Sequence, residues 1–469
     1  MHKKARGGSC EGEKSGAQSG VEDGLAAVDF PLLSMFNAFI STAARHNKKA
    51  DDRQIKDRLE QLRCPFTWNL LIEDSEVPNL ENRVLEQLEF LDNSHNARTH
   101  NLLAYVKHLN GQNEEALECL KKAEDLIQKE YADHLDRRSL VTWGNYAWVY
   151  YHMGRLAEAQ TYLDKVEKTC KKFSSPFCYR MEDPWMDSDE GWALLKCGGR
   201  NYGRAKACFE KALEVDPDNP EFSAGYAITT YRLEGFNPTT KYKTSFSLQP
   251  LRRALKLNPE NVYVKVLLAL KLQDVGKKAE GEKLLEEALS SQSSQIYVFR
   301  YAAKFYRRKG CLDKALQLLK MALEAAPTSA ILHHQIGLCY KEQLRKSRGK
   351  DPKQASSTLR LAIAHFEAAV KEKPTFGLAY LDLANMYTKG GEYQKAEDTY
   401  QKVLSLREVN KSLLQQIHFR YDQFQERHRK PEGDARACSS RGLNVDRESD
   451  AQGKIVSALE KLSIRPSSE

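Results

Sequence analysis

The chain of 469 residues carries 72 Lys and Arg against 64 Asp and Glu, giving a net charge of +8, and 41% of its residues are hydrophobic. This composition describes a folded chain whose mildly basic balance permits a polyanionic partner without demanding one. No apolar run approaches the roughly 20 residues that a membrane-spanning helix needs, so we expect no membrane partner.

The cysteines and the N-terminal sequence indicate a reducing compartment. Ten cysteines are scattered singly, without a CxxC pair or a Cys/His cluster at zinc spacing. The basic start of the chain is followed by polar, Gly-rich and acidic sequence, which is typical neither of a secretory signal nor of a mitochondrial presequence. We therefore predict a cytoplasmic protein without metal or cofactor.

The first part of the chain changes character near Asp51. Residues 1–50 are rich in Gly, Ser and charge, and we expect them to be disordered. Apolar residues recur at helical spacing over residues 53–63, and a turn, CPFTWNL, follows. A second amphipathic helix is predicted over residues 79–91, where Asn79 is a plausible cap.

From about residue 97 the sequence repeats itself. Each unit has small residues at its eighth and twentieth positions, and many units have Gly near the fifteenth and Pro at the thirty-second. This pattern is typical of tetratricopeptide repeats, which are pairs of antiparallel helices. One pair cannot bury its apolar face alone, so the series predicts an all-α superhelical solenoid over residues 51–427. Recognisable units start near residues 97, 140, 186, 220, 262, 296, 330 and 377.

Two insertions and the end of the chain depart from this pattern. Residues 237–245 delay the second helix of one unit. The basic stretch 341–357 reads as a solvated loop between helices, or as a border of the same anion site as the groove described next. Residues 410–425 look like the first helix of a ninth unit. Residues 428–469 diverge, and we interpret them as a truncated or altered end.

The helix predicted over residues 300–310, RYAAKFYRRKG, is the main candidate binding surface. Its four cations fall at i, i+4, i+7 and i+8 and share one stripe. By the repeat register this stripe faces the concave groove, where basic and aromatic side chains suit phosphates and stackable bases. A carboxylate-rich protein tail would fit the same electrostatics. The groove residues are Arg300, Lys304, Arg307 and Arg308 in this unit, and Arg232, Tyr263 and His334 in others, with Lys196 next to the groove face.

No feature of the sequence predicts catalysis. Gly198-Gly199 connects two helices and is not a phosphate-binding loop. No Ser/His/Asp or Cys/His set stands out from the packing pattern, and His333-His334 lacks partners at ligand spacing. We therefore expect no enzymatic activity.

Residues 57–427 resemble the IFIT family, the interferon-induced proteins with tetratricopeptide repeats. The phrases that carry the resemblance include LEQLRCPFTWNL, NLLAYVKHLNGQNEEAL, EGWALLKCGG, YVFRYAAKFYRRKG and PTSAILHHQIGLCYK. The resemblance is nearest to the first member and its close paralogue, which favour capped RNA. It implies an antiviral effector that holds the 5′ end of viral single-stranded RNA in a central, positively charged tunnel and inhibits translation. The ends held would be 5′-triphosphate or a cap lacking 2′-O-methylation.

The resemblance also implies a role for each matching residue. Stacking of Trp192 on the cap guanine is among these roles; from the residues alone, Trp192 fits a core position equally well. The 5′ phosphates or cap bridge would be contacted by Arg83 and Gln87, and the cap pocket would be formed by Leu91, Trp192 and Ile228. Phosphates would be bound by Lys196, Arg300 and Lys304, and the first ribose would be crowded by Tyr202 and Arg232. The next nucleotides would be held by Tyr263, Tyr301, His334 and Gln335, and the backbone would be touched by Lys373.

The resemblance has limits and leaves a rival. Residues 1–50 match nothing in the family, and stretch 341–357 looks shorter than in relatives. The family's last helical pairs are missing after about residue 427, which argues against homodimerisation. Other IFIT proteins and translation initiation factors remain implied partners. The alternative function is a tetratricopeptide scaffold whose basic groove clamps acidic peptide tails or initiation factors.

Overall fold

The computed structural model describes residues 52–72, 96–236, 246–290, 296–346, 351–406 and 411–428, together with single positions between 77 and 85. The chain divides into two units, residues 1–56 and 57–469. Of the first unit only residues 52–56 are described, and they are helical. All the repeats belong to the second unit.

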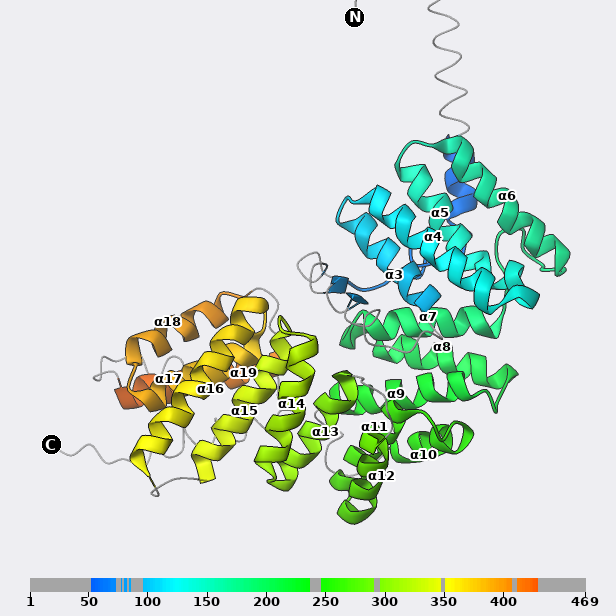
Figure 1. Cartoon of the computed structure of the whole chain (residues 1–469). Coiled ribbons are helices and arrows are strands. Elements are labelled where there is room, and N and C mark those ends of the chain that lie inside the picture. Colours follow the sequence, from blue (N-terminus) through cyan, green and yellow to red (C-terminus); the bar gives the residue numbers. More distant parts are fainter. Residues whose placement is uncertain are drawn as a thin grey trace, which may run out of the picture. The chain divides into compact units, whose positions relative to one another are not determined.

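The second unit is built from helix pairs that stack in chain order (Figure 1). No strand occurs among the described residues, and the predicted all-α tetratricopeptide solenoid is confirmed. The pairs are α3 (Asn96–Leu109) with α4 (Asn113–Glu130), α5 (Leu135–His152) with α6 (Leu156–Lys172), α7 (Pro184–Lys196) with α8 (Tyr202–Val215), α9 (Pro220–Phe236) with α10 (Leu248–Leu257), α11 (Val262–Asp274) with α12 (Lys278–Ser290), α13 (Ile296–Lys309) with α14 (Leu312–Ala325), α15 (Ala330–Lys346) with α16 (Pro352–Glu372), and α17 (Gly377–Gly390) with α18 (Tyr393–Leu404). Helix α19 (Lys411–His428) follows, and short 3₁₀ turns, η3 (Ala132–His134) and η4 (Gly199–Asn201), precede α5 and α8.

Small residues let the helices of a pair approach closely. Ala303 of α13 and Ala315 of α14 are fully buried where these two helices pack. Gly310 ends α13 with φ at +93°, a conformation that costs glycine little and other residues much. The residues that define the repeat therefore act as predicted: they set the crossing of two helices and the turn between them.

The first helices of successive units form the row that carries the predicted site. Contacts join α7 to α9, α9 to α11, α11 to α13 and α13 to α15. One apolar core runs from Val266 of α11 to Phe424 of α19. Helix α19 packs against α17 and α18, and the tilted rings of Tyr421 and Tyr400 have centroids 5.2 Å apart.

The basic stretch 341–357 is mostly helical, so the prediction of a loop there was wrong. Helix α15 continues to Lys346, and α16 begins at Pro352. Asp351 caps α16 by accepting a hydrogen bond from the backbone N–H of Lys353 over 2.9 Å, and proline is well suited to the first helical position. The sequence Asp351-Pro352 thus starts α16 within the basic stretch and lengthens the pair of α15 and α16. Residues 347–350 lie outside the described residues, as do the other insertion, 237–245, and the ends 1–50 and 429–469.

The turn after residue 62 folds against α7 and α8. Arg63 forms ion pairs with Asp187 and Glu190 of α7, with N–O distances of 2.7 and 2.9 Å. Asn201 donates to the backbone oxygen of Leu71 over 3.0 Å, and Arg204 donates to that of Trp68 over 2.6 Å. Helix α7, which carries two predicted site residues, is therefore held by a segment more than a hundred residues away in sequence.

Candidate functional site

A cluster of arginines and tyrosines joins α9, α11 and α13. Arg232 donates hydrogen bonds to the hydroxyl of Tyr263 over 3.2 Å and to the backbone oxygen of Leu195 over 3.4 Å. The rings of Tyr263 and Tyr301 lie 5.7 Å apart, and the guanidinium of Arg300 lies 4.8 Å from the Tyr301 ring. The structure thus brings together four of the predicted site residues. We call Arg232, Tyr263, Arg300 and Tyr301 the Arg–Tyr cluster.

Charge inside the Arg–Tyr cluster changes the pKa of its members. Burial alone would raise the pKa of Tyr301, but Arg300 and then Arg232 lower it to about 7. For Arg232, burial lowers the pKa and the tyrosines Tyr263 and Tyr301 raise it above the usual value. The cluster is therefore a half-buried, positively charged site in which a phenol hydroxyl is unusually acidic.

Lys196 lies at the end of α7 and is bound to α3. Its ammonium donates a hydrogen bond to Oγ1 of Thr99 over 2.8 Å. Burial, followed by the charge of Arg98, lowers the pKa of Lys196 to about 7. A phosphate bound nearby would raise the pKa of this amine and so favour its protonated form.

Trp192 stands one turn before Lys196 on α7. Its ring meets Phe209 edge to face at 5.3 Å, and the guanidinium of Arg98 lies over the ring at 5.9 Å. The indole Nε1 is buried without a hydrogen-bond partner within the described part of the chain. Ile228 of α9 is only 3% exposed. Trp192 is half-buried, so neither the core nor the groove interpretation is excluded by burial alone.

The remaining cations of α13 divide into paired and available ones. Arg308 is paired with Asp274 at 2.7 Å, and Arg307 donates to Oε1 of Gln335 over 3.5 Å. Burial, then the charge of Arg308, lowers the pKa of Lys304. The four cations predicted to share one stripe thus differ: Arg308 is neutralised, whereas Lys304 is a half-buried cation near Arg300.

His334 has a partner that the sequence did not reveal. Its Nε2 lies 2.9 Å from Oδ2 of Asp382, and the ammonium of Lys341 lies 2.5 Å from the other oxygen. Burial would raise the pKa of Asp382, but His334 and Lys341 lower it. The carboxylate fixes the imidazole of His334, which is 6% exposed.

Other predicted residues are placed with less connection to these groups. Tyr202 begins α8 and is half-buried, and Lys373 follows the last residue of α16, with its backbone N–H bonded to the oxygen of Ala369. Arg83, Gln87 and Leu91 lie outside the described residues. Within the described residues, no group of three His, Cys, Asp or Glu side chains could hold a metal ion, and no helix is long and apolar enough to cross a membrane.

Sequence reasoning missed Arg98, Thr99 and Asp382. Arg98 is the second residue of the unit that starts at 97, and second positions face the groove, so the register could have found it. Thr99 and Asp382 carry no such signal. They were identifiable only through their contacts with Lys196 and His334.

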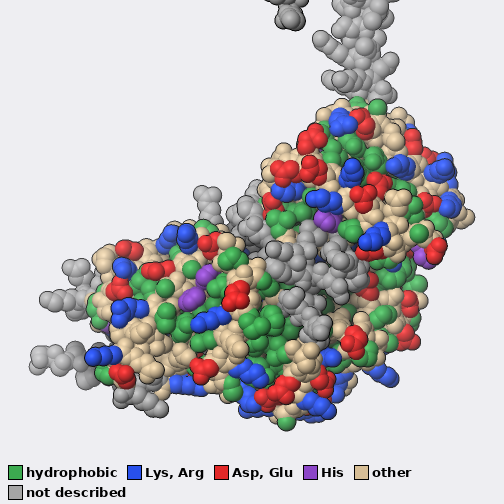
Figure 2. Space-filling view, in the orientation of Figure 1, with side chains coloured by type: hydrophobic (Ala, Val, Ile, Leu, Met, Phe, Trp, Pro, Cys, Tyr) green, Lys and Arg blue, Asp and Glu red, His purple; other side chains and the backbone are tan. Residues whose placement is uncertain are grey.

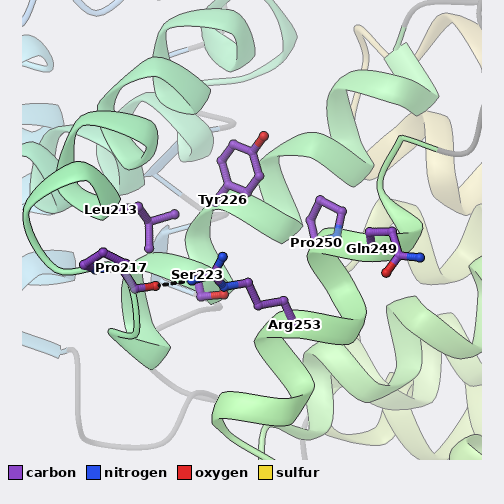
Figure 3. A pocket seen from close by; sticks show the side chains of 7 residues that line it. All are labelled: Leu213, Pro217, Ser223, Tyr226, Gln249, Pro250 and Arg253. Carbon is purple, nitrogen blue, oxygen red and sulfur yellow. Dashed lines mark hydrogen bonds between the residues drawn. The ribbon is translucent and has the colours of Figure 1, made fainter.

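Two further surfaces are distinct from these groups. Figure 2 shows basic and acidic side chains interspersed on the face in view, without a broad field of one sign. A hollow of about 380 Å³ lies between α8, α9 and α10. Its lining residues are drawn in Figure 3, among them Arg253, which donates to the backbone oxygen of Pro217 over 2.8 Å. The hollow is lined by Leu213, Pro217, Ser223, Tyr226, Gln249, Pro250 and Arg253. None of these is a predicted site residue.

Comparisons with known proteins bear on this site. The tetratricopeptide-repeat family matches residues 96–172, 199–219 and 379–412. The chain is 60% identical over 423 residues to the antiviral innate immune response effector IFIT1 of Homo sapiens, a match that covers 88% of each chain. It is 45% identical over 418 residues to interferon-induced protein with tetratricopeptide repeats 2 of Homo sapiens, covering 87% of each.

Solved structures of a relative are also similar. One is the human IFIT1 dimer with m7Gppp-AAAA, at 60% identity and a TM-score of 0.81, covering 87% of this chain and 90% of that one. Another is the human IFIT1 dimer with PPP-AAAA, at 58% identity and a TM-score of 0.79, with the same coverage. The resemblance found in the sequence is confirmed, and identity is higher to IFIT1 than to the second relative. The chain belongs to the family of interferon-induced proteins with tetratricopeptide repeats.

Proposed function

We propose that this protein is an antiviral effector that binds the 5′ end of single-stranded RNA, as a triphosphate or a cap, and thereby inhibits translation of viral messages. The observation that carries the proposal is the Arg–Tyr cluster. Within the described residues, the partners of Arg232 and Arg300 are tyrosines and a backbone oxygen, and no carboxylate pairs with either. Half-buried cations without anionic partners are costly, and a bound phosphate would offset that cost.

The relatives support this ligand class. Human IFIT1 has been solved with m7Gppp-AAAA and with PPP-AAAA, at about 60% identity to this chain. An RNA end is recognised by stacking, 2′-hydroxyl contacts and phosphate neutralisation, and the site offers each of these. Trp192 supplies a stacking surface, Tyr202 and Arg232 would meet the first ribose, and Lys196, Arg300 and Lys304 would bind phosphates.

The downstream nucleotides would continue along the row of first helices. We assign them to Tyr263 and Tyr301, and then to His334 and Gln335, with Lys373 touching the backbone. Asp382 would hold the His334 ring in place for this contact. Arg83, Gln87, Leu91 and Ile228 complete the proposed cap end of the site. The central tunnel, a cytoplasmic location and a role without catalysis belong to the same proposal, with initiation factors and other family members as further partners.

The rival is a scaffold that clamps acidic peptide tails through the same cations. Aromatic rings interleaved with the cations favour RNA, because bases stack on them and aspartate or glutamate side chains do not. The expectation that homodimerisation is lost rests on residues outside the described part and stays a prediction.

Binding to four matched short RNAs tests the function directly. The RNAs carry a 5′-triphosphate, an unmethylated cap, a 2′-O-methylated cap or a 5′-hydroxyl, and affinities are measured across salt concentrations. We expect the first two to bind most tightly. Equal affinity for all four, or displacement of RNA by an acidic peptide at similar concentration, would reject end recognition in favour of a general basic groove.

A further inference from the structure

Arg98 connects parts of the stack that are not neighbours. Its Nε lies 2.5 Å from Oδ1 of Asp189 on α7, and its Nη2 lies 2.6 Å from Oε1 of Glu221 on α9. Arg98 belongs to the first helix pair, whereas its partners belong to the third and fourth. The side chains are largely buried, with 12%, 18% and 12% of their surfaces exposed. Because two of its guanidinium nitrogens are held by carboxylates of two different helices, the orientation of its plane is fixed.

This fixed guanidinium lies over Trp192. The distance from its central carbon to the ring centroid is 5.9 Å, within the range of a cation–π contact. Asp189, Trp192 and Lys196 fall at i, i+3 and i+7 on α7 and therefore share a face. Thr99, the neighbour of Arg98, accepts the hydrogen bond from Lys196. Two consecutive residues of α3 thus hold the α7 face on both sides of the indole.

The arrangement occupies one face of the indole. A guanidinium held over one side of the ring prevents a base from stacking there, so a base has to use the other side. Phe209 restrains the same ring edge to face at 5.3 Å. The indole is therefore oriented before any ligand arrives, which reduces the entropy that binding would otherwise lose.

We propose that Arg98 is a positioning residue of the cap subsite: held by Asp189 and Glu221, it covers one face of Trp192 so that a cap guanine stacks on the other. This inference rests on the proposed function. A 5′-triphosphate has no guanine to stack, so covering the ring acts on capped RNA alone, whereas the charge of Arg98, which lowers the pKa of Lys196, acts on both RNAs. A merely structural ion pair would instead affect both RNAs alike.

Arg63 provides a matched control. It is 11% exposed and pairs with two carboxylates of the same helix, Asp187 and Glu190. It makes no described contact with Trp192. Arg63→Met therefore removes the same kind of tie to α7 without uncovering the indole.

The experiment compares wild type, Arg98→Lys, Arg98→Met and Arg63→Met. Each is titrated with capped and with 5′-triphosphate RNA of one sequence, and circular dichroism reports folding. Lysine keeps the charge but lacks the planar group that reaches two carboxylates and covers the ring, so Arg98→Lys folds even where Arg98→Met does not. We expect Arg98→Lys to lower the affinity for capped RNA roughly fivefold or more relative to the affinity for triphosphate RNA. Arg63→Met should leave that ratio unchanged.

The outcomes separate the two proposals. An unchanged ratio in folded Arg98→Lys, with wild type preferring both ligands over 5′-hydroxyl RNA, overturns the role of Arg98 alone. An equal shift of the ratio in Arg63→Met overturns it as well, because any loosening of α7 would then suffice. A wild type that binds 5′-hydroxyl RNA equally well overturns the proposed function itself.

Discussion

The ammonium of Lys196 on α7 donates a hydrogen bond to the hydroxyl of Thr99 on α3 over 2.8 Å. The two residues are 97 positions apart in sequence, and their contact places a buried amine next to Arg98. The pKa of this amine, about 7 because of burial and Arg98, lies far below that of a solvated lysine. The site thus contains a group whose charge depends on both pH and ligand.

RNA binding is expected to take up protons above neutral pH. At pH 8 the free protein has a mostly neutral Lys196 and an ionised Tyr301, since both have a pKa of about 7. A bound phosphate favours the protonated form of each, so its pKa rises and binding consumes protons. Affinity for 5′-triphosphate RNA should therefore fall as pH rises above 7, by at most about tenfold per pH unit and group. Calorimetry in buffers of different ionisation enthalpy measures the uptake.

Two variants identify which groups take up the protons. Lys196→Met should remove the contribution of the amine, and Tyr301→Phe that of the phenol. Below about pH 6 both groups are already protonated, and the uptake should vanish. Proton release on binding at pH 8, or uptake that survives both substitutions, would contradict the assignment.

Arg300→Ala should weaken the binding of every 5′-phosphorylated RNA. Arg300 lies against the rings of Tyr297 and Tyr301, at 4.9 and 4.8 Å, and supplies one of the two cations of the Arg–Tyr cluster. Loss of one phosphate contact is expected to reduce the slope of log affinity against log salt by about 1. Arg253→Ala is the control, because Arg253 lies outside the proposed site and bonds to Pro217. An unchanged slope in Arg300→Ala would remove it from the phosphate path.

Trp192→Ala should separate the two classes of 5′ end. Stacking of one base on an aromatic side chain contributes about 1 to 3 kcal/mol, which capped RNA would lose and triphosphate RNA would keep. Fluorescence anisotropy with end-labelled RNAs measures both affinities. A uniform loss for both RNAs would indicate that Trp192 is a core residue, as its position beside Ala193 also allows.

Tyr202→Ala should relax discrimination against 2′-O-methylated caps. Tyr202 begins α8 and is half-buried, and with Arg232 it is proposed to crowd the first ribose. Removing the ring creates room for a methyl group, so affinity for methylated RNA should rise several-fold relative to the unmethylated cap. A parallel fall of both affinities would instead identify Tyr202 as a general contact.

Gly225→Ala tests the packing beneath the cap subsite. A Cβ at Gly225 would overlap the Phe209 ring, with Cζ at 2.5 Å, and Phe209 in turn contacts Trp192. Overpacking of this kind costs about 1 to 3 kcal/mol in the free energy of unfolding. Gly203→Ala is the control, because its Cβ would meet no atom within 4 Å. Urea unfolding should show a loss for the first variant and none for the second.

The repeat architecture could be predicted from local sequence because its period is local. Small residues such as Ala303 and Ala315 recur at fixed offsets, and each pair folds mainly through contacts between adjacent helices. The same register predicted that Arg232, Tyr263 and Arg300 share one side of the stack, and contacts through Tyr301 join them in the structure. The exception, stretch 341–357, shows the limit: its basic composition favoured a loop, whereas the cap at Asp351 makes it helix.

What the sequence by itself determined is the helix pairs and the family. What only the tertiary structure decided is which groove residues are paired, buried or oriented. Arg308 is neutralised by Asp274, whereas Lys304 forms no ion pair with any described residue. Arg98 meets Asp189 and Glu221 across 91 and 123 positions of sequence. Such contacts depend on the rotation between successive helix pairs, which accumulates along the stack. The repeat pattern within one pair does not specify that accumulated rotation.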